Sequence, residues 1–127
     1  MNQRIALGLA MLAGATFGAV AVNGLHAQGK AGAYAIVDIT AINDLDTFKT
    51  LFPIAQKALD ATGGKYVVRT ENATALDGTP PKRFVVIAFD SMDKAKAWHT
   101  SAETKQVDEI RAKSTNSRSF LVEGFAN

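Results

Sequence analysis

"RFVVIAF", residues 83–89, decides the fold of this chain. After Arg83 every residue of the stretch is apolar, which is typical of a central strand covered on both faces. "SMDKAKAWH", residues 91–99, follows at once and places Met92, Ala95 and Trp98 at helical spacing behind a Ser91 cap. The two stretches predict a buried strand and a helix that packs on its sheet.

The same patterns recur on both sides of this unit. Alternating or β-branched runs predict strands at "AYAIVDIT" (33–40), "KYVVRT" (65–70) and "SRSFLVEGF" (117–125). "NDLDTFKTLFPIAQKALDATGG" (43–64) predicts a helix that starts at Asn43 or Asp44, bends or breaks at Pro53 and ends at Gly63-Gly64. "SAETKQVDEIRAKS" (101–114) predicts another helix, capped by Ser101, with Glu103 in its first turn.

The order strand, helix, strand, strand, helix, strand is that of an α+β, ferredoxin-like fold. It has a four-stranded antiparallel sheet with its helices on one face. Alternation assigns a mixed set of side chains to the open face: Tyr34, Ile36, Asp38, Arg69, Val86, Ala88, Leu121 and Glu123. Such a half-apolar face predicts a homodimer, a dimeric α/β barrel with a cavity between its sheets. A slip of one residue in a strand would reverse its assignments.

The first 27 residues have a different composition from the rest. "MNQR" is followed by an uncharged apolar run from Ile5 to Val22 and by small residues up to Ala27, the pattern of a secretory signal peptide. We therefore expect a signal peptide at 1–27, a domain at 28–127 and an exported protein, periplasmic or secreted. The alternative is a membrane anchor formed by residues 5–22.

The charge balance argues against a nucleic-acid partner. The 14 basic and 12 acidic residues alternate along the chain, whereas phosphate binding needs clustered Lys and Arg. Loss of Arg4 with the signal peptide would lower the formal net charge from +2 to +1. The chain has no Cys, which excludes disulfides, thiolate nucleophiles and iron–sulfur clusters.

Ionisable side chains on the predicted open face are the main candidates for chemistry. Asp38 and Glu123, as acids, and His99, as a base, are the catalytic candidates. Tyr34, Arg69 and Arg118 are the candidates for ligand binding, and Arg83 is a weaker one. The alternative for Asp38, Arg69 and Glu123 is a structural ion-pair set.

"AWHTSAE", residues 97–103, is explained more simply by one helix ending and another beginning. We expect Trp98 to anchor the core and His99 to lie partly buried at the sheet edge. After signal cleavage His99 would be the sole His, which excludes a metal site of several His within one subunit. No cofactor is predicted, although one helix-borne His leaves haem as a minor alternative.

Three blocks carry a family resemblance: "ATGGKYVVRT", "PKRFVVIAFDSMDKAKAWHTSAE" and "IRAKSTNSRSFLVEG". They resemble the bacterial family of domain of unknown function 1330 over about residues 33–125. The recurrent family residues match Gly63, Gly64, Arg69, Arg83, Trp98, Ser101, Glu103, Arg111, Arg118, Glu123 and Gly124. The resemblance implies a dimeric α/β barrel but no activity. The chain departs from the family pattern at Ala102 and Thr104, where a Pro and an aromatic residue are expected.

Three functional hypotheses follow. The first is an exported dimer that binds a small apolar or weakly anionic ligand between its subunits. The second is a cofactor-free enzyme of the monooxygenase or isomerase kind. The third is a structural or interaction dimer whose open face leaves no cavity.

Overall fold

The computed structural model describes residues 32–126, which form one sheet and four helices. The predicted signal peptide and the alternative anchor at residues 5–22 lie outside the described residues. The elements follow one another as β1 (Ala33–Ile42), α2 (Leu45–Lys49), α3 (Phe52–Thr62), β2 (Lys65–Thr70), β3 (Arg83–Phe89), α4 (Met92–Thr100), α5 (Ala102–Ser114) and β4 (Thr115–Glu123).

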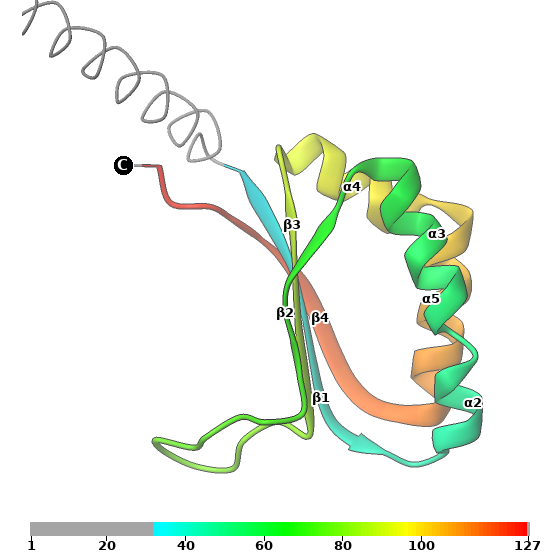
Figure 1. Ribbon diagram of the computed structural model, residues 1–127, viewed down its shortest axis with the longest axis vertical. Coiled ribbons are helices and arrows are strands. Elements are labelled where there is room, and N and C mark those ends of the chain that lie inside the picture. Colours follow the sequence, from blue (N-terminus) through cyan, green and yellow to red (C-terminus); the bar gives the residue numbers. More distant parts are fainter. Residues whose placement is uncertain (1–31, 127) are drawn as a thin grey trace, which may run out of the picture.

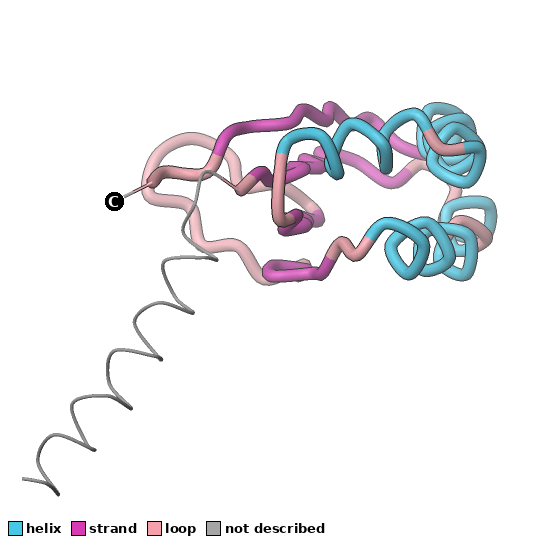
Figure 2. Tube along the Cα trace, turned by 90° about the horizontal axis from the view of Figure 1, so that it is seen from above, coloured by secondary structure: helices cyan, strands magenta, loops and turns pink. Residues whose placement is uncertain are grey.

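The sheet is antiparallel, with the strand order β2-β3-β1-β4. The helices of residues 32–126 all lie on one side of the sheet, and within these residues the other side carries no helix (Figure 1). The view from above separates the layer of strands from the layer of helices (Figure 2). The predicted α+β, ferredoxin-like fold is therefore confirmed. No helix within residues 32–126 has the length and apolar character needed to cross a membrane.

The helix ends lie where short-range signals place them. Asp44 caps α2, Ser91 caps α4 and Ser101 caps α5, each by accepting a hydrogen bond from a backbone N–H three residues later. Pro53 occupies the first turn of α3, so the predicted break divides α2 from α3. Gly63 ends α3 at φ 76°, a left-handed conformation that favours glycine.

The core lies between the helices and the odd-numbered residues of the two central strands. Its fully buried members on β1 and β3 are Ala33, Ala35, Ile39, Val85, Ile87 and Phe89. Trp98 packs on this cluster, with its ring centroid 5.4 Å from that of Phe89. The expectation that Trp98 anchors the core is confirmed.

Strand register corrects part of the predicted open face. Leu121 pairs with Ala35 and Arg69 with Val85, so both lie on the helix-covered face. Glu123 pairs with Ala33 and lies two residues beyond Leu121, so it belongs to the same face of the strand. Placing these three side chains on the open face was wrong. The other assignments to the open face, Tyr34, Ile36, Asp38, Val86 and Ala88, are confirmed.

Candidate functional site

The helices and the sheet enclose a mostly apolar pocket of about 70 Å³ on the covered side. Its floor comes from Val37, Val85 and Ile87, and α3 and α5 supply much of the facing wall. Three guanidinium groups reach it from different elements, so we call it the arginine pocket. It is lined by Val37, Ile39, Phe48, Leu51, Phe52, Ala55, Tyr66, Arg69, Arg83, Val85, Ile87, Trp98, Val107 and Arg111.

Arg83 begins β3 and is the most distinctive side chain of the pocket. It is only 16% exposed, and its guanidinium carbon lies 5.8 Å from the ring centre of Phe48 and 5.3 Å from that of Phe52. Its ion pair with Glu71 is long, at 3.7 Å, and Glu71 is itself mostly exposed. Within residues 32–126 the Arg83 side chain makes no hydrogen bond. Two aromatic rings therefore hold a largely buried cation whose donors are unused.

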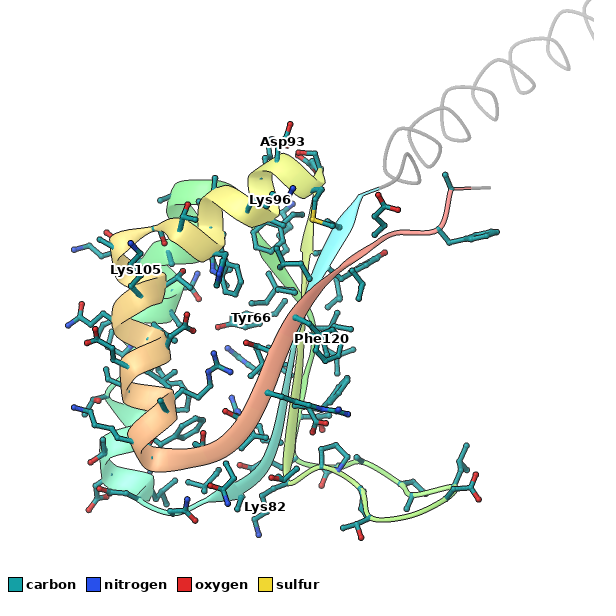
Figure 3. The ribbon with its side chains drawn as sticks, turned by 180° about the vertical axis from the view of Figure 1, so that it is seen from behind. Tyr66, Lys82, Asp93, Lys96, Lys105 and Phe120 are labelled. Carbon is teal, nitrogen blue, oxygen red and sulfur yellow. The ribbon has the colours of Figure 1, made fainter. Side chains whose placement is uncertain are left out.

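Arg69 approaches the same end of the pocket from the neighbouring strand. It pairs with Val85, two residues beyond Arg83, so the two arginines are diagonal neighbours on one face of the sheet. Its guanidinium carbon lies 4.6 Å from the ring centre of Tyr66. In Figure 3, Tyr66 projects from the sheet toward the helices. Arg69 is exposed, so it lies at the mouth of the pocket, and two cations on neighbouring strands of one face favour the binding of an anion.

Arg111, from α5, closes the opposite end and is already well paired. It is 13% exposed and donates hydrogen bonds to Asp108 at 2.7 Å, Ser119 at 3.3 Å and Ser117 at 3.5 Å. These bonds hold its guanidinium over β4. Within residues 32–126, the guanidinium groups of the pocket that make no hydrogen bond therefore lie at the end formed by Arg69 and Arg83, where the long contact with Glu71 is the one ion pair.

The structure separates the residues that sequence analysis grouped as a site. Asp38 and Arg118 meet on the open face, with Asp38 Oδ2 3.2 Å from Arg118 Nε. Asp38 Oδ1 is buried and accepts no hydrogen bond from the described residues. Tyr34 lies on the same face, partly exposed, whereas Arg69 lies in the arginine pocket on the other side. The set of Asp38, Arg69 and Glu123 therefore does not form one site.

His99 is exposed near the end of α4, rather than partly buried as expected. It borders a second pocket between α4, α5 and β4, together with Trp98 and Asp108. Among residues 32–126 no group of three His, Asp or Glu side chains could hold a metal ion.

Sequence reasoning missed Tyr66 and Arg111 as members of a pocket and ranked Arg83 low. A signal for four of the pocket residues was present, because Arg69, Arg83, Trp98 and Arg111 match recurrent residues of the resembled family. Their convergence depends on packing between α5 and the sheet, which strand alternation does not describe.

The fold defines the class of protein: a ferredoxin-like α+β domain with a pocket between its sheet and its helices. The chain belongs to the family described as "Domain of unknown function (DUF1330)", whose sequence model matches residues 32–125. Among curated proteins, none has a significantly similar sequence.

Several solved structures share the fold at low sequence identity. A protein of unknown function from Rhodopseudomonas palustris is 9% identical, covers 77% of this chain and 85% of its own, and has a TM-score of 0.62. A putative antibiotic biosynthesis monooxygenase from Caulobacter crescentus is 11% identical, with coverages of 76% and 91% and a TM-score of 0.54. SnoaB, a cofactor-independent oxygenase from Streptomyces nogalater, is 14% identical, with coverages of 72% and 91% and a TM-score of 0.50. Identities this low establish the fold alone.

Proposed function

We propose that the arginine pocket binds the carboxylate of a small organic acid. The observation that carries this proposal is Arg83, a largely buried guanidinium that makes no hydrogen bond among residues 32–126 and whose ion pair with the mostly exposed Glu71 is long, at 3.7 Å. A buried charge is costly unless it is paired, and a planar guanidinium matches a carboxylate through two parallel hydrogen bonds. Phe48, Phe52 and Val85 supply apolar contacts for the carbon atoms next to the carboxylate.

The geometry favours binding over the enzyme hypothesis. The candidate acids and base lie in three different places: Asp38 on the open face, Glu123 at the end of β4 and His99 exposed in the last turn of α4. The polar groups that line the arginine pocket are three guanidinium groups and the phenol of Tyr66. These groups are suited to holding an anion, whereas general-base catalysis needs a group that accepts a proton near neutral pH.

Trp98 provides a direct test, because it is the only Trp of the chain and lines the pocket. Hexanoate should change its fluorescence in a saturable manner, and hexanol should do so much more weakly. Arg83→Met replaces the apolar stem of the side chain with one of similar size and removes its charge, so hexanoate affinity should fall about 10-fold or more.

Arg118→Met is the matched control, since it removes an arginine from the open face of the sheet. This variant should bind hexanoate like the unmodified protein. Equal affinities for Arg83→Met and the unmodified protein would contradict the proposal.

We also propose that the open face pairs with a second copy of the chain. Tyr34 is 37% exposed there and Phe120 is 44% exposed, on a face that no helix covers (Figures 1 and 3). Burying such apolar surface favours association. Tyr34→Asp should convert a dimer into a monomer in sedimentation velocity, whereas Leu45→Asp, an exposed change on α2, should not. A monomeric unmodified protein would refute this assembly.

Export is the third part of the proposal and rests on the pattern of residues 1–27. We expect the mature protein to begin near Gln28 after cleavage at Ala27. The intact mass of the protein recovered from its host would check this, and a full-length chain in the membrane fraction would support the anchor instead.

A further inference from the structure

A second pocket, of about 180 Å³, lies between α4, α5 and β4. It opens along β4, an edge strand of the sheet, so we call it the edge pocket. Apolar side chains supply most of its surface. Its lining consists of Ala35, Trp98, His99, Asp108, Ser119, Phe120 and Leu121.

The edge pocket and the arginine pocket share a wall. Trp98 lines both of them. Arg111 lines the arginine pocket, while Asp108 and Ser119, to which it donates hydrogen bonds at 2.7 and 3.3 Å, line the edge pocket. One layer of side chains therefore separates the two pockets, and Trp98 is its apolar part.

The two pockets differ in volume, so each pocket suits a different part of a ligand. An apolar cavity of about 150 Å³ accommodates benzene. The arginine pocket has about half that volume, so it suits an anionic head group rather than the whole body of an organic acid. The edge pocket exceeds that volume and can hold an apolar body.

The charges indicate a ligand with one anionic end. Arg69 and Arg83 supply the positive charge at the far end of the arginine pocket, where Glu71 is a distant and mostly exposed partner of Arg83. The edge pocket instead carries the carboxylate of Asp108, which already pairs with Arg111. A second anion there would face this carboxylate, and like charges at short range repel.

We propose that the edge pocket is a second subsite, which receives the unbranched apolar chain of a monocarboxylic acid. The head group of this acid binds to Arg69 and Arg83, and rotation of the Trp98 side chain opens the shared wall so that the acyl chain enters the edge pocket. The site crosses from β3 over β1 to β4, which is about 10 Å at the spacing of neighbouring strands. This inference rests on the proposed function of the arginine pocket and specifies its ligand.

A series of straight-chain acids tests the inference by calorimetry on the full chain. Acetate, butanoate, hexanoate and octanoate differ only in the length of the chain. Each methylene that enters an apolar pocket should raise affinity about threefold to fourfold, and the increase should continue to octanoate. An affinity that stops rising at butanoate would overturn the second subsite and leave the arginine pocket intact. Failure of every acid to bind would overturn the proposed function together with the inference.

Leu121→Phe fills the edge pocket from the sheet and does not touch the arginine pocket. Val122→Phe is the matched control, because the next residue of β4 points to the open face. Leu121→Phe should lower octanoate affinity at least 10-fold and leave butanoate affinity unchanged, and Val122→Phe should change neither. Equal octanoate affinities for the two variants would overturn the inference. If Leu121→Phe does not fold, the acid series on the unmodified protein still decides the question.

Discussion

Alternate residues of the same strands form the two faces of the sheet, but the arginine side chains of the two faces differ in their exposure to solvent. On the covered face, Arg83 and Arg111 are 16% and 13% exposed and lie among aromatic and apolar side chains. On the open face, Asp38 is 17% exposed, but the cation that pairs with it, Arg118, is 76% exposed. A charge under the helices needs a specific partner, whereas an exposed charge is solvated by water. The covered face is therefore where a ligand gains most from an ionic contact.

The largest difference between the faces should appear in core packing. Phe89→Ala removes a buried ring that contacts Trp98, so we expect a loss of about 3–5 kcal/mol in the free energy of unfolding. Val86→Ala, on the open face of the same strand, should cost about 1 kcal/mol. Urea unfolding of both variants measures the difference. Equal losses would mean that the open face is packed as tightly as the covered one.

The next comparison concerns Arg111, which lies over the covered face of β4, and Arg118, which lies on the open face of the same strand. Arg111→Ala removes three hydrogen bonds from a mostly buried guanidinium and should cost about 1.5–3 kcal/mol. Arg118→Ala removes an exposed ion pair and should cost less than about 1 kcal/mol. Urea midpoints at low and high salt provide the measurement. A larger loss for Arg118→Ala would reverse our ranking of the faces.

Gly64 shows how closely the covered face is packed. A Cβ at this position would lie 2.6 Å from Phe89 Cε1 and 2.9 Å from Leu59 Cδ2. Gly64→Ala should therefore cost about 1–3 kcal/mol through overpacking. If that contact is the cause, adding Phe89→Leu should cost less in the Gly64→Ala background than in the unmodified protein. A double-mutant cycle tests this coupling, and additive losses would argue against it.

The smallest effect lies at the start of α2, away from both faces. Hydrogen bonds from the Thr47 hydroxyl and the Thr47 backbone N–H hold the pKa of Asp44 below its ordinary value. The folded state therefore favours the carboxylate. The resulting stability is present above the unfolded pKa of about 3.8 and is lost as pH falls through the lower folded pKa.

Asp44→Asn keeps a good capping residue and removes the titration. Stability near neutral pH should change little, and the slope of stability against pH should become shallower in the acid range. Unfolding curves between about pH 6 and pH 3 would show this difference. An unchanged slope would mean that other carboxylates account for the acid sensitivity.

The face of Arg69 was predicted wrongly because β2 is irregular. In β2 the register shifts between Tyr66 and Val68, so Arg69 turns to the same face as Tyr66. A bulge adds one residue to one strand and reverses the alternation beyond it. No local pattern in "KYVVRT" marks that shift, because it arises from pairing with β3.

The error in β4 has another cause. Phe120 and Val122 face the open side, while Ser117 and Ser119 lie on the covered face as partners of Arg111. A prediction from hydropathy alone therefore places the side chains of this strand on the wrong faces of the sheet. Polar residues on the covered face are favourable here, because they satisfy a guanidinium that α5 brings over the strand.

The sequence by itself determined the order of the elements and their ends, through signals that act within a few residues. Caps such as Ser91 and Ser101, the break at Pro53 and the left-handed Gly63 are of this kind. Only the tertiary structure decided which face each arginine occupies and that Arg69, Arg83 and Arg111 surround one pocket. These arginines come from β2, β3 and α5, and their convergence depends on strand register and on the packing of α5 against the sheet. Contacts between residues distant in the chain set both, so neither can be read from local spacing.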